Sequence, residues 1–205
     1  MNTVRSRPQP SKRQPEPAWD IAHLFPVQGD WTEDDYFRLV TKRGYELCDG
    51  RLEMLPMPTE LHQMIASYLF SALKAHATLH QLGLVLFSGL RVRTLPGKVR
   101  EPDIVFMHHN HSAKRSNQKW DGADLAMEIV SDDDPNRDRV VKRREYAKAG
   151  IAEYWIVDPQ KDSITILVLK GSSYRILGEY RRGEVAKSNL LTGFEVDVRA
   201  ALKGE

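Results

Sequence analysis

The chain has 205 residues, of which 41% are hydrophobic, and a formal net charge of +2 at neutral pH. This length and composition are typical of one soluble globular domain with a real core. No run of residues approaches the ~18 apolar positions of a membrane span, and the N-terminus has no apolar signal core, so we expect a cytoplasmic protein without a membrane partner. The single cysteine, Cys48, excludes an internal disulfide framework.

The positive charge is concentrated in the N-terminal tail. Residues 1–17 are rich in proline, glutamine and basic side chains and carry a net charge of +3, which leaves −1 for residues 18–205. The composition of the tail predicts disorder because it offers almost no apolar surface to bury. We therefore expect a disordered basic tail over 1–17 and a single domain over 18–205, whose overall charge does not argue for DNA binding.

The first predicted elements are a short helix and a β-hairpin. Thr32 opens a capping-box pattern, which predicts a helix that ends at Gly44. Residues 45–48 and 51–55 then flank Asp49-Gly50, a dipeptide that supplies the positive φ angles of a type I′ turn.

A long amphipathic helix and a series of strands follow. Apolar residues recur at helical spacing from Thr59, and Gly83 supplies the predicted stop, while residues 114–122 are polar and predict a surface loop. Strand-like runs occur at 84–87, 90–93, 103–107, 125–130, 154–157, 164–169 and 174–177. This mixture predicts an α+β (α/β-like) fold with a mixed central β-sheet flanked by helices and an N-terminal hairpin.

Two acidic residues stand inside apolar strand-like runs. Asp103 precedes Ile104-Val105-Phe106, and Glu128 lies within Leu125–Val130. A carboxylate in a sheet interior is costly unless it meets a cation or a hydrogen-bond network, so two such acids indicate a metal site.

A basic helix is predicted over residues 134–150, with Asp134 as its N-cap and Gly150 just beyond its end. Asp138, Lys142 and Tyr146 recur at every fourth position, so they share one helix face. This face can direct a carboxylate and an ammonium group toward a neighbouring sheet.

Five runs of this sequence carry a resemblance to a known family: residues 45–50, His62-Gln63, 102–105, 127–131 and 138–159. Together they resemble the Uma2 family, which is described as restriction endonucleases within the PD-(D/E)XK nuclease superfamily. The resemblance covers about residues 30 to 200, and the run 138–159 is its most specific part because many positions match at once. It implies a restriction-endonuclease-like core.

The resemblance also implies a divalent metal centre for Mg²⁺ or Mn²⁺. Asp103 and Glu128 are the expected metal ligands, with the backbone carbonyl of Ile129 as a third, and the two acids are catalytic together with Lys142. The superfamily pattern has its lysine where this chain has Val130, whereas Uma2-like sequences place it on the following helix, at the position of Lys142. The remaining candidates are three accessory residues and two DNA contacts, namely Glu46, His62 and Asp138, and Arg139 and Arg143.

Each role has a simpler alternative. Asp103 can be a strand-start residue that accepts turn hydrogen bonds, and Glu128 can form a buried pair with an arginine. Lys142 alone is typical of a solvated helix position, His62 of a capping or solvent-facing residue, and Glu46 of a hairpin surface.

The leading hypothesis is a divalent-metal-dependent endonuclease that hydrolyses DNA phosphodiester bonds through a metal-activated water. The alternative is a non-catalytic nucleic-acid-binding or defence-associated module that retains the nuclease fold, and Val130 in place of lysine favours it. A homodimer is expected by analogy alone. The sequence has no Gly-rich phosphate loop, His-Glu-x-x-His motif or Gly-x-Ser-x-Gly elbow, so ATP-dependent, zinc-protease and serine-hydrolase chemistry lack a basis.

Overall fold

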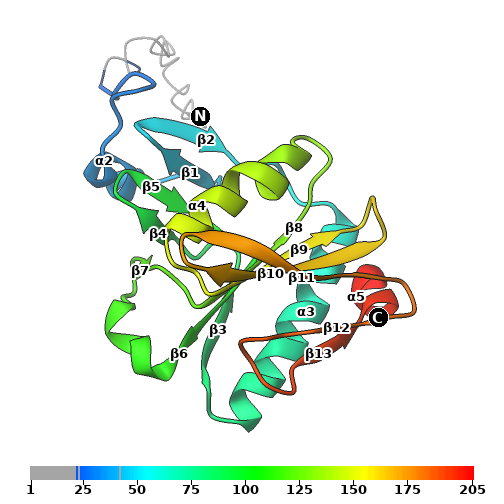
Figure 1. The fold of residues 1–205 in the computed structure, drawn as a ribbon. Coiled ribbons are helices and arrows are strands. Elements are labelled where there is room, and N and C mark those ends of the chain that lie inside the picture. Colours follow the sequence, from blue (N-terminus) through cyan, green and yellow to red (C-terminus); the bar gives the residue numbers. More distant parts are fainter. Residues whose placement is uncertain (1–21, 23, 42) are drawn as a thin grey trace, which may run out of the picture.

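The computed structural model describes residues 22, 24–41 and 43–205, and the predicted tail over 1–17 lies outside them. The main sheet has the strand order β11-β10-β9-β8-β6-β3. Its strands are β3 (Gly83–Phe87), β6 (Ile104–His108), β8 (Leu125–Ile129), β9 (Glu153–Asp158), β10 (Ser163–Lys170) and β11 (Ser173–Arg181). β8 and β9 are parallel and the other pairs are antiparallel, so the predicted mixed central sheet is confirmed (Figure 1).

A smaller sheet has the order β2-β1-β5-β4-β7, and a separate two-stranded hairpin pairs β12 with β13. The strands are β1 (Tyr45–Cys48), β2 (Arg51–Met54), β4 (Val92–Leu95), β5 (Lys98–Arg100), β7 (Trp120–Asp121), β12 (Val185–Lys187) and β13 (Glu195–Asp197). The predicted hairpin is confirmed, and both turn residues, Asp49 and Gly50, have positive φ angles. β5, β12 and β13 escape prediction because three residues are too few to show an alternating pattern.

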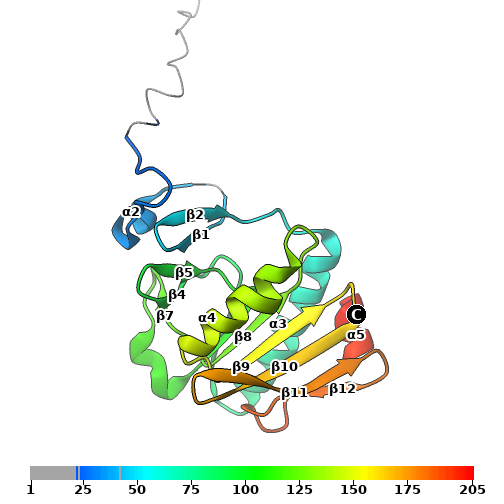
Figure 2. The same cartoon turned by 45° about the horizontal axis from the view of Figure 1, so that its top comes forward.

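The helices cover both faces of the main sheet. They are α2 (Glu33–Arg38), α3 (Glu60–Leu79), α4 (Arg143–Lys148) and α5 (Val198–Lys203), with a 3₁₀ helix at His109–Lys114 and a π-helix at Arg137–Lys142. α3, α5 and β13 pack on one face and α4, β4 and β7 on the other, so the two cores lie on opposite sides of the sheet. Figure 2 shows α4 in front of the sheet and α3 behind it. Within the described ranges, no helix combines the length and apolar character needed to cross a bilayer.

Helix α2 has the predicted start and an earlier end. The Thr32 hydroxyl accepts a hydrogen bond from the Asp35 N–H, and the Asp35 carboxylate accepts one from the Thr32 N–H, so the capping box is confirmed. The predicted extension to Gly44 is wrong, because Leu39 is extended and Val40 is 98% exposed. Beyond Arg38 the chain has no core against which another helical turn can pack.

Helix α3 begins after Thr59, as predicted, and the Thr59 hydroxyl accepts a hydrogen bond from the His62 N–H. The prediction that Gly83 stops this helix is wrong. The helix ends at Leu79, and Gly83 is the first residue of β3. A Cβ atom at Gly83 would lie 2.2 Å from the Met107 carbonyl oxygen, so the glycine allows two strands to approach closely.

Two further sequence predictions need correction in position. The strand predicted over 90–93 is observed as β4, because the turn at Gly89, which has a φ of +95°, delays entry into the sheet until Val92. The surface loop predicted over 114–122 contains β7, which pairs with β4 and buries the Trp120 side chain.

The helix predicted over 134–150 is irregular. Residues 137–142 form the π-helix, which then continues into α4, and Gly150 beyond its end has a φ of +79° as expected. A π-helix widens the turn by one residue and is frequent at functional sites. Here it carries the two buried charged residues Asp138 and Lys142.

A buried arginine ties the smaller sheet to α4. Arg100 in β5 is fully buried, and its guanidinium lies 2.9 Å from Glu46, 2.8 Å from Glu53 and 2.8 Å from Glu145. These carboxylates come from β1, β2 and α4, so a single cation joins three elements. The Glu145 carboxylate also accepts a hydrogen bond from the Thr94 hydroxyl of β4.

We expect Arg100→Met to lower the free energy of unfolding by about 3–5 kcal/mol, because it leaves the buried acid Glu145 without its cation and Glu46 with Lys142 alone. Urea unfolding followed by tryptophan fluorescence measures the change. Arg182→Ala removes an arginine from a surface pair with Asp162 and is the matched control, with an expected loss of about 0–1 kcal/mol. Equal losses in the two variants would contradict a structural role for Arg100.

Candidate active site

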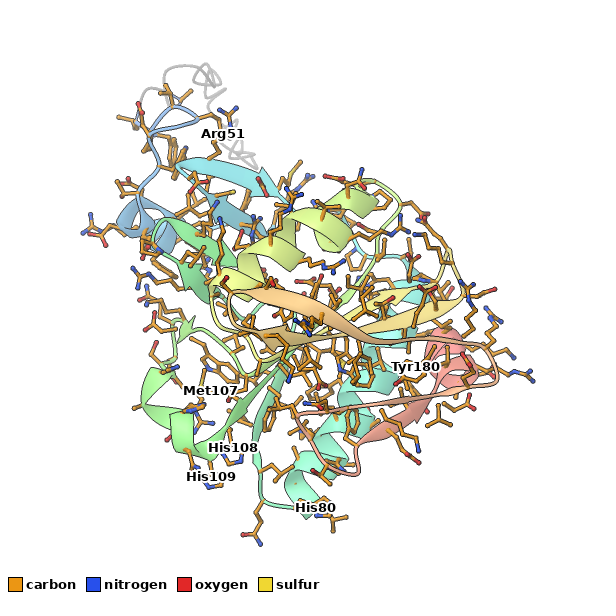
Figure 3. All side chains as sticks on the ribbon, in the orientation of Figure 1. Arg51, His80, Met107, His108, His109 and Tyr180 are labelled. Atoms are coloured by element: carbon orange, nitrogen blue, oxygen red, sulfur yellow. The ribbon has the colours of Figure 1, made fainter. Side chains whose placement is uncertain are left out.

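A pocket of about 330 Å³ lies where the C-terminal end of β8, the start of β6, the start of α3 and the π-helix meet. Its charged lining residues are six acids and two permanent cations: Glu101, Asp103, Glu128, Asp132, Asp133 and Asp138, and Arg137 and Lys142. His62 also lines it. His80 and His108 do not, because they lie at the ends of α3 and β6 that are away from the pocket (Figure 3). The pocket is therefore predominantly acidic.

The ammonium group of Lys142 lies at the centre of a buried cluster of carboxylates. Its Nζ is 3.0 Å from Glu128 Oε2, 3.3 Å from Asp138 Oδ1 and 3.5 Å from Glu46 Oε1, and all four residues are buried. Burial lowers the pKa of Lys142, but the carboxylates of Glu128, Glu46 and Asp138 outweigh it and hold the pKa above its ordinary value. Lys142 is therefore a charged ammonium group.

Glu128 is buried between a hydroxyl group and an ammonium group, with further carboxylates nearby. Its Oε1 accepts a hydrogen bond of 2.5 Å from the Tyr146 hydroxyl, and its Oε2 faces Lys142. Burial, aided by the nearby carboxylates of Asp138 and Asp103, raises the pKa of Glu128 to about 8 against the opposing effect of Lys142. Burial also raises the pKa of Asp138. Both shifts come first from burial, and the neighbouring carboxylates add to it.

Asp103 lies directly before β6 and next to Glu128. Because β6 and β8 are antiparallel with Ile104 opposite Met127, the residues one step further, Asp103 and Glu128, come together at the sheet end. Asp103 Oδ2 accepts a 2.8 Å hydrogen bond from the Ile129 N–H and lies 3.2 Å from His62 Nε2. Burial lowers the pKa of His62, but the hydrogen bond and charge of Asp103 outweigh it and raise the pKa.

The structure brings most of the predicted site residues together. The two predicted ligands, the predicted lysine and the three accessory candidates surround one pocket or its floor: Asp103, Glu128, Lys142, Glu46, His62 and Asp138. The alternative positions of Glu46 on the hairpin surface and of Lys142 in solvent are wrong, because both side chains are buried. Ile129 uses its N–H toward Asp103, and metal ligation by its carbonyl stays a prediction.

The two predicted DNA contacts lie apart from the pocket lining. Arg139 donates hydrogen bonds of 2.9 and 2.6 Å to Asp158, and Arg143 is half-buried on α4. Neither side chain lines the pocket, so their contact with DNA stays a prediction without support from the pocket geometry.

Arg137, which lines the pocket directly before Asp138, was not among the predicted site residues. Its Nε is buried and has no hydrogen-bond partner within the described part of the chain. Its Nη2 contacts are long, at 3.5 Å to Ser131 Oγ and 3.6 Å to Asp133 Oδ2. Its place beside Asp138 in a basic run was only a weak sign that it lines the pocket. A regular α-helix would not direct the same side chains toward the sheet as the observed π-helix does.

The pocket has the donor chemistry of a site for a hard divalent cation. Carboxylate oxygens are the ligands that Mg²⁺ and Mn²⁺ prefer, and six acids against two permanent cations line this pocket. Asp103 and Glu128 could hold such an ion. Among residues 22, 24–41 and 43–205, no three His, Cys, Asp or Glu side chains are already arranged as a metal site, because Glu128 and Asp138 are directed toward Lys142.

Comparison with known proteins agrees with this geometry. One solved structure that is similar to this chain, with a TM-score of 0.71 and 16% identity, is that of an Anabaena variabilis protein described as "a putative nuclease belonging to DUF820". The match covers 85% of this chain and 98% of that one, which shows a shared fold. No curated protein matches the chain. The model of the Uma2 family, described as "Putative restriction endonuclease", matches residues 33–199, and the chain therefore belongs to the Uma2 family.

Proposed function

We propose that this protein is an endonuclease that hydrolyses DNA phosphodiester bonds with Mg²⁺ or Mn²⁺ held by Asp103 and Glu128. The observation that carries the proposal is the convergence of these two strand-end acids with the buried ammonium of Lys142 in one open pocket. Membership of the Uma2 family supports it. Cytoplasmic location and a homodimer stay predictions.

Hydrolysis of a phosphodiester requires an activated water and relief of the negative charge that grows on the phosphate. A bound divalent cation supplies both, because it lowers the pKa of water and polarises phosphoryl oxygens. The residues of the chain must hold the phosphate and orient the water so that the two meet in the reactive geometry.

Lys142 contributes positive charge and hydrogen bonds rather than base catalysis. Its carboxylate neighbours hold its pKa above the ordinary value, so it has no free electron pair with which to accept a proton. Its Nζ borders the pocket 3.0 Å from Glu128, where it can donate to a water or to a phosphate oxygen. The buried contacts with Glu128 and Asp138 hold the ammonium in place.

Arg137 is the residue that we expect to bind the phosphate. It lines the pocket, its Nε has no hydrogen-bond partner among the described residues, and its other contacts are long. A guanidinium group presents several donors in a plane that matches a phosphate. Because Nε itself is buried, a phosphate in the pocket would bind the terminal nitrogens, whose contacts to Ser131 and Asp133 are long.

The alternative function is a non-catalytic nucleic-acid-binding or defence-associated module with the same fold. Val130, at the position of the superfamily lysine, is buried and favours this alternative. The position of Lys142 next to Glu128 weakens it, because an ammonium group is present although it comes from a different element.

The purified protein should cleave DNA when Mg²⁺ or Mn²⁺ is present, and Asp103→Asn or Glu128→Gln should reduce the rate by about a hundredfold or more, because each removes a charged oxygen ligand. Gel electrophoresis of a plasmid measures nicking and linearisation. Asp162→Asn, which changes an exposed acid that does not line the pocket, is the control.

Unchanged cleavage in both pocket variants would exclude these residues from catalysis. Calorimetric titration with Mn²⁺ separates the two functions, because a non-catalytic module without a metal centre would bind no Mn²⁺. If the wild-type protein binds Mn²⁺ and Asp103→Asn binds it weakly or not at all, the result would support Asp103 as a metal ligand.

Lys142→Met should lower the free energy of unfolding by about 3–5 kcal/mol, because it leaves Glu128, Asp138 and Glu46 buried without their shared cation. Adding Glu128→Gln to this variant should restore part of the loss, since one of the acids is then neutral. A double-mutant cycle by urea unfolding measures the coupling, which we expect to reach about 1 kcal/mol or more. Additive losses would show that the two side chains do not interact.

Arg137→Gln should raise the KM for a DNA oligonucleotide about tenfold or more while kcat changes little, because a charged hydrogen bond to a phosphate is lost. Arg144→Gln, on the exposed side of α4, is the control and should leave KM unchanged. A loss of kcat at constant KM would instead assign Arg137 to the chemical step.

A further inference from the structure

A second pocket, of about 460 Å³, lies beside the first. It is built between the first half of α3 and the end of β3, and its aromatic walls are Phe70 and Phe87. His62, Ser88 and Asp103 line both pockets, so the two share a wall. A molecule bound near Asp103 therefore has direct access to the aromatic pocket.

The aromatic pair is not explained by core packing alone. The rings of Phe70 and Phe87 have centroids 4.9 Å apart and meet edge to face at 72°. Phe70 is half-buried against the core under α3, whereas Phe87 is 55% exposed and belongs to none of the hydrophobic clusters of the described residues. Exposure of a phenylalanine beside a pocket leaves a ring face available for a ligand.

The face of α3 under this pocket carries two small side chains, Ala66 and Ser67, between larger ones. Gln63, Ala66, Ser67 and Phe70 follow one another at helical spacing, and the two small side chains leave room between the rings and the helix. Gln63 and Ser67 are exposed and supply polar groups at the edge of the pocket.

A cation lies just beyond the aromatic wall. Lys74 is one helical turn after Phe70, is exposed, and has its Nζ 5.3 Å from the centre of the Phe70 ring. Lys74 therefore places a positive charge one helical turn beyond the pocket residues of α3.

We propose that this second pocket binds an unpaired nucleobase of the substrate strand, next to the phosphate that lies in the candidate active site. The proposal rests on the proposed nuclease function and deepens it, because it identifies the substrate class as single-stranded or locally unpaired DNA. A base has a π face for Phe87, edge groups for Gln63 and a flanking phosphate for Lys74. A base inside a duplex cannot enter such a pocket without leaving its stack.

Other occupants match the pocket less completely. An apolar side chain of a partner protein would use the rings and would leave the Lys74 charge and the polar edge without a role. A strand of nucleic acid uses the aromatic walls, the cation and the wall shared with Asp103 together, which is the combination that single-strand-binding sites employ.

The test is equilibrium binding of a single-stranded DNA oligonucleotide that carries one 2-aminopurine, measured with the full chain in EDTA by fluorescence and anisotropy. We expect the base to be quenched on binding and Phe87→Ala to weaken binding roughly 5- to 150-fold, which is the range expected for the loss of one stacked base. Phe87→Leu should weaken binding similarly although it retains apolar volume, and Phe87→Trp should bind at least as tightly as the wild type.

The control is Leu84→Ala, an exposed residue of the same strand that does not line the pocket, and it should bind normally. Unchanged affinity in Phe87→Ala, full retention in Phe87→Leu, or no binding of the oligonucleotide at all would overturn the proposal. Because this assay contains no metal and no turnover, its result is separate from the cleavage assay. Absence of stacking with intact cleavage would overturn the proposed base pocket alone. Stacking without cleavage would overturn the proposed nuclease function alone.

Discussion

The burial of one ammonium group among three carboxylates is the constraint on which the rest of this structure depends. Lys142 could not be buried without Glu46, Glu128 and Asp138, and Glu128 and Asp138 could not be buried without Lys142, because an unpaired charge in the interior costs several kcal/mol. The acids come from β1, β8 and the π-helix. Pairing these charges therefore brings the smaller sheet, the main sheet and the basic helix to one place.

Glu46 links this cluster to the second buried cation. Its Oε2 lies 2.9 Å from Arg100 and its Oε1 lies 3.5 Å from Lys142. Burial raises the pKa of Glu46, but Lys142 and Arg100 outweigh it and lower the pKa, whereas the pKa of Glu128 is raised. Two acids beside the same lysine therefore have pKa values shifted in opposite directions, and Glu46 is the one with two cations beside it. Of these two acids, Glu128 is the one that lines the pocket.

The elements that sequence analysis predicted correctly depend on neighbours along the chain. The capping box at Thr32, the turn at Asp49-Gly50 and the amphipathic pattern of α3 are local signals, and the strand-end acids Asp103 and Glu128 follow from apolar runs. All of these patterns can be recognised from a few adjacent residues.

The features that escaped prediction depend on contacts between distant segments. β7 consists of two residues that pair with β4, and nothing local marks them as a strand. The buried position of Glu46 depends on Arg100, more than fifty residues away. Arg137 reaches the pocket through a π-helix, which a regular helical pattern does not predict. The position of Lys142 was predicted from the family resemblance, since its spacing alone is equally typical of a solvated residue.

The two pockets differ in charge, and this difference implies two modes of attachment for one strand. Six acids and two permanent cations line the first pocket, so a phosphate meets net repulsion there until the acids are compensated. Occupancy by a divalent cation and by a phosphate should therefore be linked, each raising the affinity for the other. The second pocket has aromatic walls, with Asp103 only at the shared boundary, and Lys74 stands beside it. A base can dock there before a cation offsets the charge of the acidic pocket. Because His62 and Asp103 line both pockets, the adjoining phosphate would then lie beside Arg137 and Lys142.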